Sequence, residues 1–110
     1  MVVDDDADIR EALCDILEDE GYATIAAGNG QVALEKLHGG RKPCMILLDL
    51  MMPVMDGWKF REAQQRDPEL AKIPVVVITA AGKQASALSP RVLPKPLKVE
   101  EVLQAVADYC

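Results

Sequence analysis

The sequence is poor in the residues that mark disulfide-rich proteins and histidine-dependent enzymes. Its 110 residues include three cysteines, one histidine and 4% aromatic residues. Cys14, Cys44 and Cys110 are odd in number and form no C-x-x-C pair, so we expect small buried thiols in a reducing compartment. His38 stands beside Gly39-Gly40 without a catalytic serine or cysteine pattern, and we interpret it as a charge at a helix end.

Long apolar runs, repeats and an excess of positive charge are also missing. No stretch reaches the roughly 18 apolar residues of a membrane span, and no segment resembles a signal peptide. Lys and Arg total 12 against 18 Asp and Glu, a net charge of −6. This sign disfavours direct binding of nucleic acid or an anionic membrane. With 50% hydrophobic and 27% charged residues, the chain is expected to be one cytoplasmic domain over residues 1–110.

Apolar segments of strand length alternate with segments of helical periodicity. Strands are predicted over residues 1–3, 22–27, 44–49, 74–79 and 91–94, and helices over 7–20, 32–37, 58–66 and 99–106. Segment 44–49 is apolar almost throughout, which is typical of a strand covered on both faces. The alternation predicts an α/β domain with a parallel sheet and right-handed crossovers.

Polar residues gather at the predicted carboxyl ends of these strands. Ligands of such sheets bind beyond those ends, where the strand order reverses. The residues found there are Asp4, Asp5, Asp49, Thr79 and Lys95. Three neighbouring carboxylates repel one another unless a cation lies among them, and oxygen ligands with few protein donors suit Mg²⁺, with Mn²⁺ as the alternative ion. A hydroxyl and an ammonium nearby predict a site where a carboxylate accepts a phosphoryl group.

Four motifs in this order give the sequence a specific family resemblance. They are Val2-Val3-Asp4-Asp5-Asp6, the run from Leu47 to Gly57 (LLDLMMPVMDG), Ile78-Thr79-Ala80 and Lys95-Pro96. With them the chain resembles the receiver domain of two-component response regulators, the CheY-like family, over nearly its whole length. The resemblance implies a doubly wound, flavodoxin-like sheet of five parallel strands in the order 2-1-3-4-5, with helices on both faces.

The resemblance also implies a role for each site residue. Asp49 would accept the phosphoryl group from a sensor histidine kinase or a phosphotransfer protein, and the domain would then slowly dephosphorylate itself. Asp5, Asp49 and the backbone carbonyl of Met51 would ligate Mg²⁺, with Asp4 acting through a metal-bound water. Lys95 would pair with a phosphoryl oxygen, Thr79 would hydrogen-bond the phosphorylated state, and the Lys95-Pro96 bond would be cis. The cognate kinase and the downstream effector are not implied.

Several residues also have a purely structural interpretation. Asp6 and Asp8 are expected to stabilise a helix start, and Asp56-Gly57 is mainly a turn and helix-start signal. The run Asp4-Asp5-Asp6-Ala7-Asp8 imitates a calcium loop, but Ile9 stands where that loop needs glycine.

The sequence departs from the family pattern in three places. Only fifteen residues, 80–94, separate Thr79 from Lys95, which predicts a shortened fourth helix within residues 80–90. Val92 stands where the family usually has an aromatic residue, so we expect an intact acceptor site with an altered output face. The opening strand is about half the expected length, which a trimmed N-terminus would explain, and both a stand-alone and an excised receiver fit the chain.

Two rival functions stay open at this point. One is a degenerate receiver that binds partners without taking phosphate, although none of the acids, the acceptor or the lysine is lost. The other is a Mg²⁺-dependent phosphatase of the haloacid-dehalogenase-like kind, since Asp4-x-Asp6 superficially fits its D-x-D motif. That family needs a cap or a longer chain, and it would leave Asp49 unexplained.

Overall fold

Five parallel strands form one sheet in the computed structural model, which describes residues 1–40, 42–50, 52, 54–79 and 91–110. β1 (Val2–Val3) lies between β2 (Ala26–Ala27) and β3 (Ile46–Asp49), and β4 (Val75–Thr79) lies between β3 and β5 (Arg91–Pro94). The order β2-β1-β3-β4-β5 and the parallel direction confirm the predicted fold.

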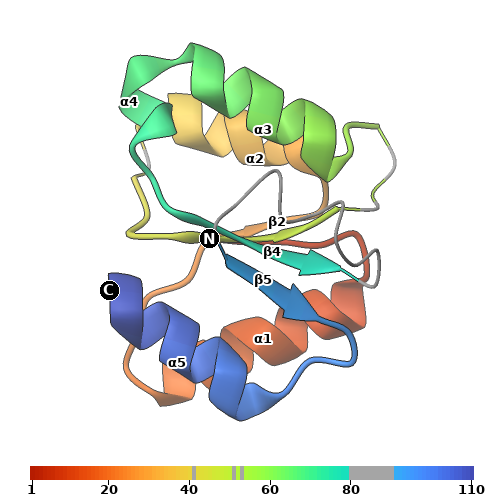
Figure 1. Ribbon diagram of the computed structural model, residues 1–110, viewed down its shortest axis with the longest axis vertical. Helices are drawn as coiled ribbons and strands as arrows, with labels where there is room; N and C mark the ends of the chain where they lie inside the picture. The colour runs from red at the N-terminus through yellow and green to blue at the C-terminus, as the bar shows by residue number, and fades with distance from the viewer. Residues whose placement is uncertain (41, 51, 53, 80–90) are drawn as a thin grey trace.

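Helices cover both faces of this sheet (Figure 1). On one face lie α1 (Ala7–Asp19) and α5 (Val99–Tyr109). On the other lie α2 (Gly30–His38), α3 (Gly57–Arg66) and α4 (Pro68–Ala71). Neighbouring strand residues alternate between two apolar clusters, so that Leu47 packs towards α1 and α5 while Leu48 packs towards α2 and α3. Burial on both faces explains the continuous apolar character of β3.

Aspartate and asparagine side chains begin four of the helices. Asp6 accepts hydrogen bonds from the N–H groups of Asp8 and Ile9, which confirms its predicted role at the start of α1. Asn29, Asp56 and Asp67 cap α2, α3 and α4 in the same way. These caps satisfy N–H groups that have no partner within the helix.

The structure differs most from the sequence prediction in β2 and in the segment that follows α3. Only Ala26 and Ala27 of the segment 22–27 form a strand, because β1 offers just two residues for pairing. The four-residue helix α4 was not predicted, although Pro68 after the capping Asp67 is a typical helix start. The expected short fourth helix falls in residues 80–90 and lies outside the described residues.

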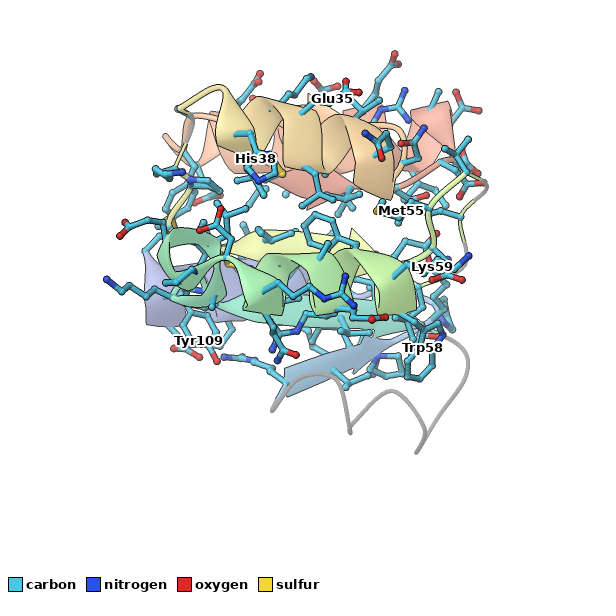
Figure 2. All side chains as sticks on the ribbon, turned by 90° about the horizontal axis from the view of Figure 1, so that it is seen from above. Glu35, His38, Met55, Trp58, Lys59 and Tyr109 are labelled. Atoms are coloured by element: carbon cyan, nitrogen blue, oxygen red, sulfur yellow. A yellow bond between two sulfur atoms is a disulfide. The ribbon has the colours of Figure 1, made fainter. Side chains whose placement is uncertain are left out.

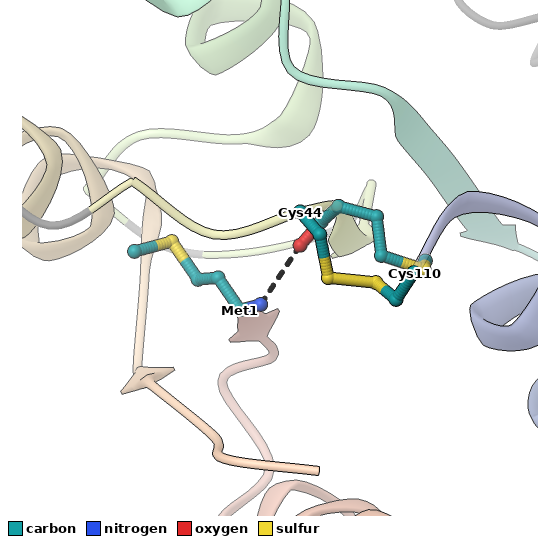
Figure 3. Close-up of a disulfide and its surroundings, with 4 residues drawn as sticks. Met1, Cys44 and Cys110 are labelled. Carbon is teal, nitrogen blue, oxygen red and sulfur yellow. Dashed lines mark hydrogen bonds between the residues drawn. A yellow bond between two sulfur atoms is a disulfide. The ribbon is translucent and has the colours of Figure 1, made fainter.

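The prediction of unpaired cysteine thiols was wrong. Cys44 and Cys110 form a disulfide with Cα atoms 5.5 Å apart, and Cys14 is the free cysteine (Figure 3). The two cysteines are 66 positions apart in sequence. β3 and α5 run in opposite directions, which places the start of β3 beside the end of α5. Spacing along the chain could not show this proximity. Both residues are exposed, so they are not the buried apolar thiols that we expected.

None of the helices in the described ranges has the length and apolar character needed to span a membrane.

Candidate functional site

Three carboxylates meet at the carboxyl ends of β1 and β3. Asp4 and Asp5 follow β1, and Asp49 is the last residue of β3. β1 and β3 pair in parallel with Val3 opposite Leu48, so both strands end at the same edge of the sheet. One oxygen from each of the three carboxylates lies within 4.8 Å of the others. The structure therefore brings together the three acids that the sequence singled out.

Asp4 is a buried carboxylate with one oxygen left unpaired. Its Oδ1 accepts a hydrogen bond from the N–H of Asp6 at 2.9 Å, whereas its buried Oδ2 has no hydrogen-bond partner among the residues that the structure describes. Burial raises the pKa of Asp4, and the neighbouring charge of Asp5 acts in the same direction. A buried oxygen without a donor is costly. A divalent cation among the three carboxylates would remove that cost, so these residues fit the metal that the acidic cluster implies.

Thr79 and Lys95 lie at the ends of the next two strands. Thr79 ends β4 and is buried, and its carbonyl accepts the N–H of Lys95 at 3.3 Å. Lys95 follows β5, and its Nζ lies 3.4 Å from Oδ1 of Asp49. The Lys95-Pro96 peptide bond is cis, as the family resemblance implied. Both residues thus stand at the same edge of the sheet as the three acids.

The loop after β3 is fixed by a close approach between Gly57 and Leu50. The N–H of Gly57 donates to the Leu50 carbonyl at 2.9 Å, and a Cβ on Gly57 would lie 2.8 Å from the Leu50 Cα. Only glycine therefore lets the first turn of α3 pack this tightly behind Asp49. Figure 2 shows Met55, Trp58 and Lys59 together at this end of the molecule, opposite His38 and Tyr109.

One contact at the site was not predicted from the sequence. Arg10, in the first turns of α1, donates from Nη1 to the Asp4 carbonyl at 2.7 Å and thereby holds the acidic turn against the helix. The only sequence signal for this contact was the position of a basic residue, Arg10, six positions after Asp4. Of the predicted ligands, Met51 lies outside the described residues.

A family model, described as the response regulator receiver domain, matches residues 1–107. The chain belongs to this family. The match covers both the acidic turn after β1 and the lysine after β5.

Two bacterial transcriptional regulatory proteins share sequence with the chain. It is 32% identical over 112 residues to a CpxR homolog from Haemophilus influenzae, a transcriptional regulatory protein, covering 96% of this chain and 47% of that protein. It is 38% identical over 84 residues to the phosphate regulon regulator PhoB of Pseudomonas aeruginosa, covering 76% of this chain and 36% of that protein. This receiver chain thus spans less than half the length of these two regulators.

Solved receiver structures have the same fold. The chemotaxis response regulator CheY4 of Vibrio cholerae superposes with a TM-score of 0.88 at 29% identity, over 99% of this chain and 95% of that one. The receiver domain of a histidine kinase from Syntrophus aciditrophicus gives a TM-score of 0.87 at 28% identity, over 98% and 86% of the two chains. A chemotaxis response regulator and the receiver domain of a histidine kinase are therefore both similar in structure to this chain.

Proposed function

We propose that Asp49 of this receiver domain accepts a phosphoryl group from a phosphohistidine in a Mg²⁺-dependent reaction. The observation that carries the proposal is the placement of Asp49, which is 3% exposed with Asp4 and Asp5 oxygens within 4.8 Å and the Lys95 ammonium at 3.4 Å. A carboxylate surrounded in this way has acidic neighbours that hold a cation and a basic neighbour that holds an anion.

The transfer is a displacement at phosphorus. An oxygen of Asp49 forms a bond to the phosphorus atom while the bond from phosphorus to the histidine nitrogen breaks, and that nitrogen leaves with its electron pair. Lys95 pairs with a phosphoryl oxygen, and the Thr79 hydroxyl donates to another. Bound Mg²⁺, or Mn²⁺ in its place, would be held by Asp4, Asp5 and Asp49 and would neutralise charge on the transferred group.

The acyl phosphate on Asp49 is then hydrolysed slowly. A water oxygen bonds to phosphorus, the bond to the Asp49 oxygen breaks, and inorganic phosphate leaves. Asp49 returns to its carboxylate form, so the domain acts as a timed switch. Its partners are a sensor histidine kinase or phosphotransfer protein in the cytoplasm and an effector that distinguishes the two states of Asp49.

The position of Asp6 favours the switch over a D-x-D phosphatase. Such an enzyme would need the carboxylates of Asp4 and Asp6 in one site. The Asp6 carboxylate instead accepts the N–H groups of Asp8 and Ile9 at the start of α1. The second acid of the motif is therefore used to cap a helix.

Incubation with acetyl phosphate and Mg²⁺, followed by intact mass and phosphate release, tests the proposal. We expect one phosphoryl adduct per chain, which Asp49→Asn abolishes and chelation of the metal prevents. Asp8→Asn is the matched control, because Asp8 is an exposed aspartate in the first turn of α1. An unmodified chain at saturating donor would indicate a degenerate receiver, and rapid turnover that depends on Asp4 instead of Asp49 would indicate a phosphatase.

A further inference from the structure

The disulfide joins the end of α5 to the segment that enters β3. Cys44 stands two residues before β3, and Cys110 follows the last helical residue, Tyr109. The sulfur bond lies beside Met1, whose ammonium donates to the Met45 carbonyl at 2.8 Å (Figure 3). Both cysteines are exposed and therefore within reach of dissolved thiols and disulfides.

The last turn of α5 makes mainly surface contacts apart from this bond. Val106 is the last buried apolar residue of the helix, and residues 107–110 are exposed. Asp108 forms an ion pair with Arg91, whose guanidinium lies 5.9 Å from the centroid of the Tyr109 ring. Exposed ion pairs contribute little to stability. The covalent bond is therefore the strongest constraint on this turn among the contacts that the structure describes.

The two cysteines also line a cavity at the amino-terminal edge of the sheet. The cavity has a volume of about 340 Å³, and Cys44, Cys110, Val106 and Met45 belong to its lining. Asp49 lies at the opposite end of β3, so loosening this lining does not disturb the acidic cluster directly.

We propose that Cys44 and Cys110 are a reversible redox lock on the carboxyl-terminal turn of α5. In the oxidised state the turn is fixed against the entry to β3, and in the reduced state it frays. A small disulfide such as oxidised glutathione is the oxidant. One cysteine thiolate attacks it and releases one glutathione thiolate, and the second cysteine thiolate then attacks the mixed disulfide and releases the other. The two cysteines lose two electrons, which the two glutathione molecules carry away, and the thiol protons pass to water.

The experiment uses a Cys14→Ser chain, so that the pair under study carries every remaining thiol. The protein is oxidised with glutathione disulfide or reduced with dithiothreitol, alkylated under denaturing conditions and weighed intact. We expect no alkylated cysteine after oxidation and alkylation of both after reduction. Reduction is also expected to speed amide exchange in the last turn of α5 by roughly tenfold or more, starting with the Cys110 N–H that donates to Val106.

Thermal unfolding of matched variants gives the second measurement. Because 66 positions separate the cysteines, opening the bond is expected to lower Tm by about 10 °C or more. Cys44→Ser and Cys110→Ser should each unfold near the reduced protein's Tm, and their Tm should not rise after oxidation because no bond between residues 44 and 110 can form. Alkylated thiols after oxidation, a disulfide-linked dimer, or equal exchange and Tm in the two states would overturn the lock. None of these readouts depends on phosphorylation of Asp49, so the two proposals fail independently.

Discussion

Lys95 Nζ lies 3.4 Å from Asp49 Oδ1, although 46 positions and an intervening strand separate the two residues. Asp49 ends β3 and Lys95 follows β5, so the lysine side chain reaches across the end of β4, where Thr79 stands. The pair thus joins the two edges of the region in which a phosphoryl group would have to fit. The ammonium of Lys95 reduces the repulsion among the three carboxylates. It also weakens the binding of a second cation at the same place.

Replacing Lys95 with methionine distinguishes the effect of its ammonium on Mg²⁺ binding from its effect on phosphoryl transfer. Without the ammonium, the acidic cluster attracts a divalent cation more strongly, and we expect Mg²⁺ to bind about fivefold more tightly. Formation of the phosphoryl adduct should fall at least about tenfold, because the transferred group loses its positive partner. Mg²⁺ titration and adduct mass measure the two quantities. Lys98→Met, at an exposed lysine near the start of α5, is the control, and a parallel change in binding and transfer would contradict the assignment.

Replacing Asp4 with asparagine should stabilise the metal-free protein and weaken its response to metal. The substitution removes a buried negative charge whose Oδ2 has no partner in the described part of the chain, and we expect the free energy of unfolding in EDTA to rise by about 1–2 kcal/mol. Saturating Mg²⁺ should stabilise the parent by about 3 kcal/mol at a hundredfold excess over Kd, and the variant much less. Urea unfolding with and without Mg²⁺ tests this, with Asp8→Asn as the comparison for removal of an exposed aspartate charge outside the cluster. A variant that loses stability in EDTA would show that Asp4 is paired in the metal-free state.

Much of this site was predictable because its residues occupy the ends of strands. Any parallel sheet brings to one edge the residues that follow Val3, Leu48, Ile78 and Pro94. The order of the strands was implied by the family motifs. The disulfide was not predictable, because it depends on where the end of α5 lies relative to β3. The Arg10 contact was missed for a similar reason, since a long side chain can reach several backbone carbonyls.

Stability should depend on pH through the amino group of Met1 when that group is free. Burial lowers the pKa of the Met1 ammonium from 8.0 to about 6. Between these values the unfolded chain binds the proton and the folded chain does not, so stability rises as pH increases from 6 to 8, by about 2 kcal/mol. Urea unfolding across this range measures the slope. An acetylated amino terminus should remove this contribution, and an unchanged slope after acetylation would contradict it.

Val54 occupies a backbone conformation that is unfavourable for a β-branched residue. Its φ is 68° and the residue is 79% exposed, so packing of its side chain contributes little stabilisation to offset the backbone strain. Val54→Asn, or Val54→Gly, should raise the free energy of unfolding by about 1 kcal/mol. Chemical unfolding measures the gain. Val99→Asn is the comparison, because Val99 is also partly exposed but begins a helix, and a similar gain there would point to side-chain polarity as the cause.

Gln64 holds the unpredicted turn between α3 and β4. Its side chain is fully buried, and its Nε2 donates to the carbonyls of Leu70 at 2.8 Å and Ile73 at 3.1 Å, while its Oε1 accepts from Arg61 Nη1 at 2.7 Å. Gln64→Leu fills a similar volume but leaves buried polar groups without this partner, so we expect a loss of about 2–4 kcal/mol.

The matched control for this substitution is Gln65→Leu. Gln65 is the exposed neighbour on the same helix, where the change should alter stability by about 0.5 kcal/mol or less. Gln64→Glu separates size from hydrogen bonding, because a carboxylate can still accept from Arg61 but cannot donate to the two carbonyls. It should therefore be nearly as destabilising as Gln64→Leu in urea unfolding. Parent-like stability of the glutamate variant would show that Arg61, and not the pair of carbonyls, is the contact that matters.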